Sequence, residues 1–333
     1  MFDEHKRKIN YMRVSITDRC NLRCIYCMPR EGITLFSHEE VLTYGEIEKV
    51  CKSVAALGIE RIKITGGEPL VRKGAVELVR KVKAIDGISQ VTLTTNGVLL
   101  EEYMDQLAEA GIDGINISVD SLDPKIYEEI TGFNMLDKVY KGIEKALKYE
   151  NIPLKVNCVP FKVYQQNINE IVSLAKNNPI HVRFIEMMPI GHGKEQEYIN
   201  EEELAKEIEK EYGKLMPFSK KLGNGPCRYF TIEGFKGKIG FISAISHKFC
   251  DSCNRVRLTS HGHLKTCLQY EEGEDLRKLL REGISDVELA EVIKKKIMEK
   301  PEGHIFKSDE CTFKDKEFRG IRENELLMSE IGG

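Results

Sequence analysis

Three cysteines lie close together near the start of the chain, at Cys20, Cys24 and Cys27. A tight run of thiols in a chain of this kind indicates a metal site. Four thiolates would close a zinc or an iron–sulfur site, whereas three leave one corner of the site open. An iron with an open position can bind a small molecule and pass an electron to it. Zinc with a distant fourth ligand remains an alternative.

A second group of three cysteines occurs far along the chain, at Cys250, Cys253 and Cys267. Zinc is a serious alternative here, because three thiols and a histidine suit that metal well. Three histidines are near enough in sequence to complete such a site: His247, His261 and His263.

The residues that follow the second cysteine pair favour an anionic ligand. Arg255-Val256-Arg257-Leu258 alternates as a strand does, and residues two apart point the same way. Arg255 and Arg257 would therefore aim two planar, bidentate donors to one side, which suits phosphate oxygens. A solvated charged face is the alternative. Lys155 shares one face of another expected strand with Asn157, and a lysine that faces into a barrel needs an anion.

The elements that must position these residues alternate between strand and helix. Expected strands cover residues 11–16, 59–64, 90–93, 114–119, 154–159 and 181–186, with one helix expected in each gap between them. Such alternation predicts a parallel sheet with right-handed crossovers. At about 31 residues per unit of a TIM barrel, this stretch holds about six units. The expected fold is an α/β partial (βα)6 TIM-like barrel, open on one side.

Four unusual segments fall at the C-terminal ends of the expected strands, where barrels carry their chemistry. They are the first cysteine loop, Gly66-Gly67-Glu68-Pro69, Thr94-Thr95-Asn96-Gly97 and Ser118-Val119-Asp120. Their shared position on one rim is stronger evidence for a site than any one of them alone.

The pattern changes after residue 212, where short strands with glycine turns begin. We therefore expect a barrel domain over residues 1–212 and a smaller α+β domain over residues 213–333, which carries the second cysteine group. Residues 1–10 are charged, and we expect them to be frayed. Cys51 and Cys158 fall on apolar faces and are expected to be structural.

Composition limits the classes of partner. The chain has 333 residues, 41% of them hydrophobic, and a formal net charge of −3, so no overall basic character favours nucleic acid or an anionic membrane. No apolar run approaches about 20 residues, and the N-terminus lacks an apolar signal region. We expect a cytoplasmic protein that binds neither nucleic acid nor membrane.

The first cysteine group, with Tyr26 before its third cysteine and the Gly-Gly-Glu turn, resembles the radical S-adenosylmethionine enzymes. The resemblance implies that Cys20, Cys24 and Cys27 hold a [4Fe-4S] cluster whose open iron chelates S-adenosylmethionine. One electron then cleaves the sulfonium to methionine and a 5'-deoxyadenosyl radical. The residues implied to contact S-adenosylmethionine are Tyr26, Gly67, Ser118 and Met188.

The whole chain is similar to the GTP-cyclising members of that family, which act in molybdenum cofactor biosynthesis. The likeness rests on both cysteine groups, on Asn-Arg-Val-Arg-Leu after the second pair, on Arg-Phe-Ile-Glu-Met-Met-Pro at 183–189 and on a terminal Gly332-Gly333. It implies a second [4Fe-4S] cluster, on Cys250, Cys253 and Cys267, that binds the guanine of GTP. The residues implied to bind GTP are Arg13, Lys63, Thr94, Lys155, Arg255, Val256 and Arg257.

The same resemblance implies the reaction. A hydrogen atom is taken from C3' of the ribose, and the resulting radical attacks C8 of guanine to give 3',8-cyclo-7,8-dihydro-GTP. Arg183, Gly332 and Gly333 are expected to support catalysis. Lys63 stands where we would expect arginine, so it keeps the positive charge but lacks the planar, forked donors of a guanidinium.

The implied partners are an electron donor such as flavodoxin or ferredoxin and a downstream cyclic pyranopterin monophosphate synthase, with the chain a monomer or homodimer. Two other interpretations remain open at this point. One is a peptide-modifying radical enzyme with an auxiliary cluster, and the other is a non-catalytic zinc-binding interaction protein.

Metal analysis after anaerobic purification separates the enzyme from the zinc protein. We expect about eight irons per chain and no zinc, because two [4Fe-4S] clusters hold that number. Two zinc ions with no iron would end the enzyme interpretation.

Overall fold

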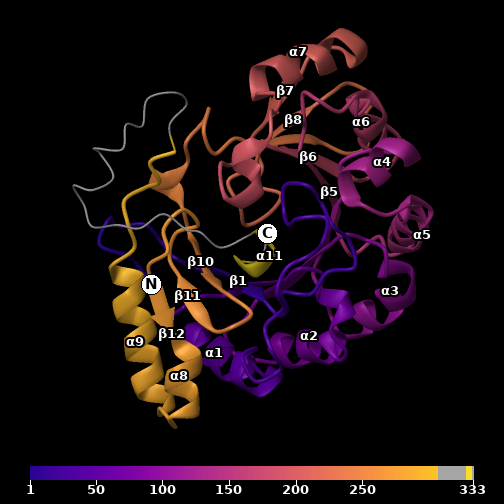
Figure 1. Cartoon of the computed structure of the whole chain (residues 1–333). Coiled ribbons are helices and arrows are strands. Elements are labelled where there is room, and N and C mark those ends of the chain that lie inside the picture. Colours follow the sequence, from indigo (N-terminus) through magenta and orange to yellow (C-terminus); the bar gives the residue numbers. More distant parts are fainter. Residues whose placement is uncertain (307–327, 332–333) are drawn as a thin grey trace.

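The structure is a computed structural model that describes residues 1–306 and 328–331 of the chain (Figure 1). Its centre is one twelve-stranded sheet, in the order β12-β11-β10-β1-β2-β3-β4-β5-β6-β9-β8-β7. The six central strands are parallel and follow the sequence order, as the partial barrel predicts. They are β1 (Tyr11–Ser15), β2 (Arg61–Thr65), β3 (Gln90–Thr95), β4 (Ile115–Ser118), β5 (Leu154–Cys158) and β6 (His181–Ile185).

Six helices follow the central strands and surround the curved sheet on its outer side (Figure 1). They are α1 (Tyr44–Ala56), α2 (Ala75–Lys83), α3 (Leu100–Glu109), α4 (Pro124–Thr131), α5 (Leu136–Leu147) and α6 (Ile168–Asn177). A capping box at Thr43 and Glu46 opens α1. The expectation of one helix between β4 and β5 was wrong. Gly132 takes a left-handed φ of 83°, which ends α4, and α5 begins after it at Leu136.

The strands of the C-terminal part extend the sheet at both of its edges. β9 (Ile239–Ile242) pairs parallel with β6, and β10 (Arg255–Leu258) pairs parallel with β1. The remaining strands are β7 (Met216–Phe218), β8 (Arg228–Thr231), β11 (His263–Lys265) and β12 (Gly273–Asp275). The remaining helices are α7 (Glu201–Tyr212), α8 (Leu276–Arg281), α9 (Asp286–Met298), α11 (Met328–Ile331) and the 3-10 turns η1 (Pro69–Val71), η2 (Gly191–Glu195) and η3 (Cys250–Ser252).

The core lies between the sheet and its outer helices. Alternate residues of the strands are fully buried there, among them Met12 on β1, Ile62 on β2, Val156 on β5 and Val256 on β10. The residues between them point to the inner, concave side. Because the helices require every second strand residue to be apolar, most polar side chains of the central strands face the concave side.

The N-terminal ten residues are ordered, so the expectation that they fray was wrong. Asp3 and Arg7 are buried, at 4% and 5% exposed, and form an ion pair of 2.7 Å. Ile9 and Asn10 are buried as well. Arg7 also binds backbone carbonyls at residues 250 and 300–302, which local sequence does not reveal.

The join between β8 and β9 contains a glycine that the packing requires. A Cβ at Gly237 would lie 1.8 Å from the carbonyl oxygen of Ile180. We expect Gly237→Ala to lower the free energy of unfolding by about 2 kcal/mol or more, measured by anaerobic urea denaturation. Gly45→Ala, in the first turn of α1 with open space around it, is the control and should leave stability unchanged or slightly raised. Equal stability of the two variants would contradict this packing.

Candidate active site

Both cysteine triads open onto one cavity. The cavity lies on the concave side of the sheet, and its lining includes Cys20, Cys24, Cys27, Cys250, Cys253 and Cys267. The cavity measures about 360 Å³, which is within the range of sites for small molecules. Two groups of thiols more than 220 residues apart in sequence therefore share one chamber.

The first triad lies on the loop after β1, and backbone hydrogen bonds tie this loop to the end of α4. Arg23 N–H donates to Thr131 O at 2.7 Å, and Ile25 N–H donates to Ile130 O at 3.1 Å. The Cys20 sulfur accepts from Leu22 N–H at 3.4 Å. Such N–H donors are the kind that support cluster thiolates.

The Gly-Gly-Glu-Pro turn packs directly on the first cysteine loop. Gly67 N–H donates to Thr17 O at 2.7 Å, and Glu68 N–H donates to Arg19 O at 2.8 Å. A Cβ at Gly67 would lie 2.4 Å from Arg19 O. The resemblance implies that glycine is needed here because S-adenosylmethionine approaches the backbone of the turn closely. The structure adds a second reason, since the cysteine loop also approaches this backbone too closely for a Cβ.

Glu68 joins three segments of the rim. Its fully buried carboxylate accepts from Leu70 N–H at 3.0 Å, from Thr95 Oγ1 at 2.8 Å and from Asn96 N–H at 2.6 Å. Asn96 in turn lies 3.8 Å from the Cys20 sulfur through its amide nitrogen. Burial raises the pKa of Glu68 to about 7, against the opposing effect of these hydrogen bonds.

Tyr26 is fixed by a carboxylate at the end of β4. Its hydroxyl donates to Asp120 Oδ2 at 2.9 Å, while Val159 N–H donates to Asp120 Oδ1 at 2.8 Å. Burial raises the pKa of Asp120 to about 6, although both hydrogen bonds oppose the shift. Ser118, at the same strand end, also lines the cavity. Asp120 therefore links β4, β5 and the cysteine loop.

The second triad is assembled from three elements: η3 carries Cys250, Cys253 precedes β10, and Cys267 follows β11. Burial acts to raise the pKa of the Cys253 thiol, but the charges of Arg255 and Lys300 outweigh it and bring the pKa to about 6. Cations beside a thiol favour the thiolate that a metal needs.

The histidines considered for a zinc site lie elsewhere. His261 stacks on Phe36 with ring centroids 4.7 Å apart, and His247 Nδ1 lies 3.7 Å from Glu201. Neither they nor His263 line the cavity. Within residues 1–306 and 328–331, no three His, Cys, Asp or Glu side chains converge closely enough to hold one metal ion. Cysteines of a four-iron cluster each bind a different iron, so they need not converge on one point.

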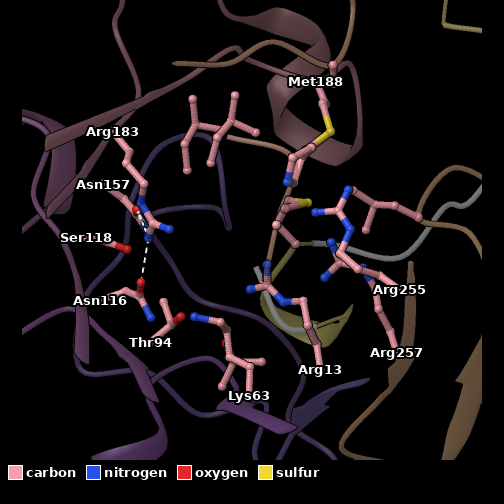
Figure 2. Close-up of a pocket in the computed structure, with 18 of the residues that line it drawn as sticks. Arg13, Lys63, Thr94, Asn116, Ser118, Asn157, Arg183, Met188, Arg255 and Arg257 are labelled. Atoms are coloured by element: carbon pink, nitrogen blue, oxygen red, sulfur yellow. Dashed lines mark hydrogen bonds between the residues drawn. The ribbon is translucent and has the colours of Figure 1, made fainter. Parts of the chain in front are cut away.

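A row of cations crosses the inner face where β10, β1 and β2 lie side by side. The register pairs Arg257 with Arg13 and Arg13 with Lys63 (Figure 2). Burial lowers the pKa of all three, and the charges of neighbouring cations lower it further. Arg13 Nε is buried without a hydrogen-bond partner. Crowded, buried cations of this kind call for an anionic ligand.

Figure 2 shows the opposite wall of the cavity, where Arg183 approaches two asparagines. The Arg183 guanidinium donates to Asn116 Oδ1 at 2.6 Å and to Asn157 Oδ1. Lys155 Nζ donates to Leu222 O, which lies on the loop between β7 and β8. Burial and the charge of Arg183 lower the pKa of Lys155 to about 8.

Most residues proposed from the sequence meet in this cavity. Besides the two triads, its lining includes Arg13, Tyr26, Lys63, Gly67, Thr94, Ser118, Lys155, Arg183, Met188, Arg255 and Arg257. Val256 does not line it; its side chain is fully buried in the core on the other face of β10, so only its backbone could face a ligand. Gly332 and Gly333 lie outside the described residues, although Met328 of α11 lines the cavity.

Sequence reasoning missed several polar residues of the site. Glu68 and Asp120 belonged to recognised motifs but were given no role, and Asn116 and Lys300 were not considered. The alternation of β4 could have found Asn116, because it is the one polar residue between Ile115 and Ile117. Nothing local marks Lys300.

Comparison with known families covers almost the whole described chain. Residues 14–176 match the Radical SAM superfamily, and residues 180–306 match the family named Molybdenum Cofactor Synthesis C. The described helices include none of the length and apolarity that a bilayer crossing demands.

Curated relatives match over their full length. A GTP 3',8-cyclase of Clostridium perfringens (strain SM101 / Type A) is 45% identical over 335 residues, and one of Heliobacterium modesticaldum is 43% identical over 337; both alignments span 100% of each chain. Among solved structures, Streptococcus suis SuiB bound to S-adenosylmethionine superposes with a TM-score of 0.59 at 15% identity, covering 86% of this chain and 68% of SuiB. That last likeness concerns the fold.

The contact between the glycine turn and the cysteine loop can be tested by one methyl group. Gly67→Ala should displace the loop of the first triad, so iron should fall from about eight to about four per chain while the second cluster remains. Gly225→Ala is the matched control, because Gly225 lines the same cavity with no atom within 4 Å of an added Cβ. Full iron in Gly67→Ala would show that the turn does not hold the loop.

Proposed function

The chain belongs to the GTP 3',8-cyclase family of radical S-adenosylmethionine enzymes, and from this premise we propose that its central cavity converts GTP to 3',8-cyclo-7,8-dihydro-GTP, the first step of molybdenum cofactor biosynthesis. The observation that carries the proposal is the cavity itself. It places two incomplete cysteine triads and a row of cations around one space.

The residues present fit two [4Fe-4S] clusters and S-adenosylmethionine. Each triad offers three thiols and leaves one iron of a cluster free for a ligand. When bound, the first cluster and S-adenosylmethionine supply the radical that removes hydrogen from the ribose. We propose that Cys20, Cys24 and Cys27 hold the first cluster, and that Tyr26, Gly67, Ser118 and Met188 contact S-adenosylmethionine. The hydrogen bond from Tyr26 to Asp120 would fix the tyrosine against that ligand.

Cys250, Cys253 and Cys267 would hold the second cluster, whose free iron would bind the guanine. The triphosphate would lie along the cation row, because Arg13, Lys63, Arg255 and Arg257 all line that part of the cavity. Charge-assisted bonds to phosphate oxygens would offset the cost of burying these cations together. Thr94, Lys155 and the backbone of Val256 complete the proposed GTP contacts.

Arg183 is positioned by its two asparagine partners rather than by a carboxylate. Its charge is therefore not neutralised by these partners and remains available to an anionic group in the cavity. We propose that it supports catalysis together with the terminal Gly332 and Gly333. The main contribution of the protein would be to fix the ribose by holding the guanine on one side of it and the triphosphate on the other. A misplaced radical would take the wrong hydrogen.

The cation row also argues against the peptide-modifying alternative. A peptide substrate does not need three buried cations in register, whereas a triphosphate does.

The proposal further includes an electron donor such as flavodoxin or ferredoxin and a downstream synthase that consumes the product. It also includes a cytoplasmic location, a monomer or homodimer, and a division of the chain at residues 1–212 and 213–333.

The phosphate role of the row can be tested at Arg257. In the reconstituted protein, Arg257→Ala should weaken GTP binding by about tenfold or more, because a hydrogen bond to a charged group contributes about 1.5–3 kcal/mol. Reductive cleavage of S-adenosylmethionine should continue. Titration calorimetry with GTP measures the first effect. Arg80→Ala, on the exposed surface of α2, is the control, and unchanged GTP affinity in Arg257→Ala would count against the assignment.

A further inference from the structure

Arg7 is a buried arginine on the N-terminal segment, and its guanidinium is engaged on all three nitrogens. Its charge is balanced by Asp3, which accepts from Arg7 Nε at 2.7 Å and from Arg7 N–H at 2.9 Å. Its other two nitrogens donate to four backbone carbonyls: Cys250 O at 3.1 Å, Glu302 O at 2.6 Å, Lys300 O at 3.3 Å and Pro301 O at 2.8 Å. Arg7 itself does not line the cavity.

The segment that Arg7 holds, residues 300–305, contacts the second triad at Cys250 and beside Cys267. His304 N–H lies 3.5 Å from the Cys250 sulfur, and the Lys300 ammonium donates to Thr266 O, one residue before Cys267.

Other residues fasten the same segment to the second triad. The Tyr270 hydroxyl donates to Gly303 O at 2.9 Å, and Ile305 N–H donates to Gln269 Oε1 at 2.6 Å. A Cβ at Gly303 would lie 3.0 Å from Cys250 Cβ, so the segment passes very close to that ligand. The 300–305 segment therefore packs directly against the second triad and contributes Lys300 and His304 to the cavity lining.

Arginine suits this position because one planar fork reaches acceptors on two separate pieces of backbone. Arg7 is more than 240 residues away in sequence from Cys250 and bonds both its carbonyl and the 300–302 carbonyls. A lysine would keep the charge beside Asp3 but could not serve four carbonyls in fixed directions. Burying the charge of Arg7 costs free energy, and its hydrogen bonds hold backbone segments in place rather than a ligand.

We propose that Arg7 is a positioning residue for the second cluster: it locks the Cys250 turn to the 300–305 segment and thereby sets the geometry in which Cys250, Cys253 and Cys267 hold the cluster and present its free iron to the substrate. The inference rests on the proposed function for the identity of that cluster. It assigns the charged N-terminal segment a part in the site.

Two backgrounds isolate each cluster for the test. Serine at Cys20, Cys24 and Cys27 leaves only the second cluster, and serine at Cys250, Cys253 and Cys267 leaves only the first. Arg7→Lys is placed in each background and in the intact chain. After anaerobic reconstitution, we measure the half-life of the remaining cluster against an iron chelator and its electron paramagnetic resonance spectrum, and we titrate the intact variant with GTP.

Arg7→Lys should shorten the half-life of the second cluster by about tenfold to 100-fold, as the loss of a partner behind a metal ligand commonly does. Its spectrum should change, and GTP binding should weaken in the intact chain. The first cluster should keep its half-life, spectrum and response to S-adenosylmethionine. Tyr270→Phe removes one other fastening of the 300–305 segment and should act in the same direction to a smaller extent.

Arg281→Lys is the matched control, because Arg281 also bonds distant backbone carbonyls but away from the cavity. It should change neither cluster. Equal loss of both clusters in Arg7→Lys, or an unchanged second cluster, would overturn the inference. If the unmodified chain holds the second cluster but binds no GTP, the proposed function fails, while the chelation result still decides the role of Arg7.

Discussion

The structure depends on the register of three parallel strands. β10, β1 and β2 are aligned so that Arg257, Arg13 and Lys63 stand side by side on the concave face. Like charges at this spacing repel, and burial adds to the cost. The strands cannot relieve it by slipping one residue, because Met12, Ile62 and Val256 would then leave the core. Apolar packing on the outer face thus enforces a cationic inner face, which a polyphosphate would stabilise.

The two ends of the cavity are built by different means. The first cysteine loop is held mostly by backbone hydrogen bonds to neighbouring turns, and Gly67 permits the close approach. The second triad is gathered from separate elements and held by buried side chains, Arg7 and Lys300 among them. The first site therefore needs only segments of the N-terminal half of the chain, whereas the second requires both ends of the described chain to meet.

Much of this could be predicted from short patterns. The alternation of strands and helices predicted the partial barrel. The alternation of apolar and polar residues within a strand predicted that Lys155 and Arg257 point inward. The break between α4 and α5 was missed because a single glycine, Gly132, does not reveal its left-handed conformation in sequence. Asp3 and Arg7 were taken for a frayed end, since the backbone carbonyls that Arg7 binds lie at residues 250 and 300–302.

By itself, the sequence determined the thiol groups, the strand–helix repeat and the family, because ligand spacing and side-chain periodicity are local properties. Only the tertiary structure decided that β10 lies against β1, which brings the second triad and its two arginines into the chamber of the first. It also decided which polar residues hold others in place, such as Glu68, Asp120 and Arg7. Pairing between distant segments is fixed by packing of the whole core, and no short stretch of sequence carries that information.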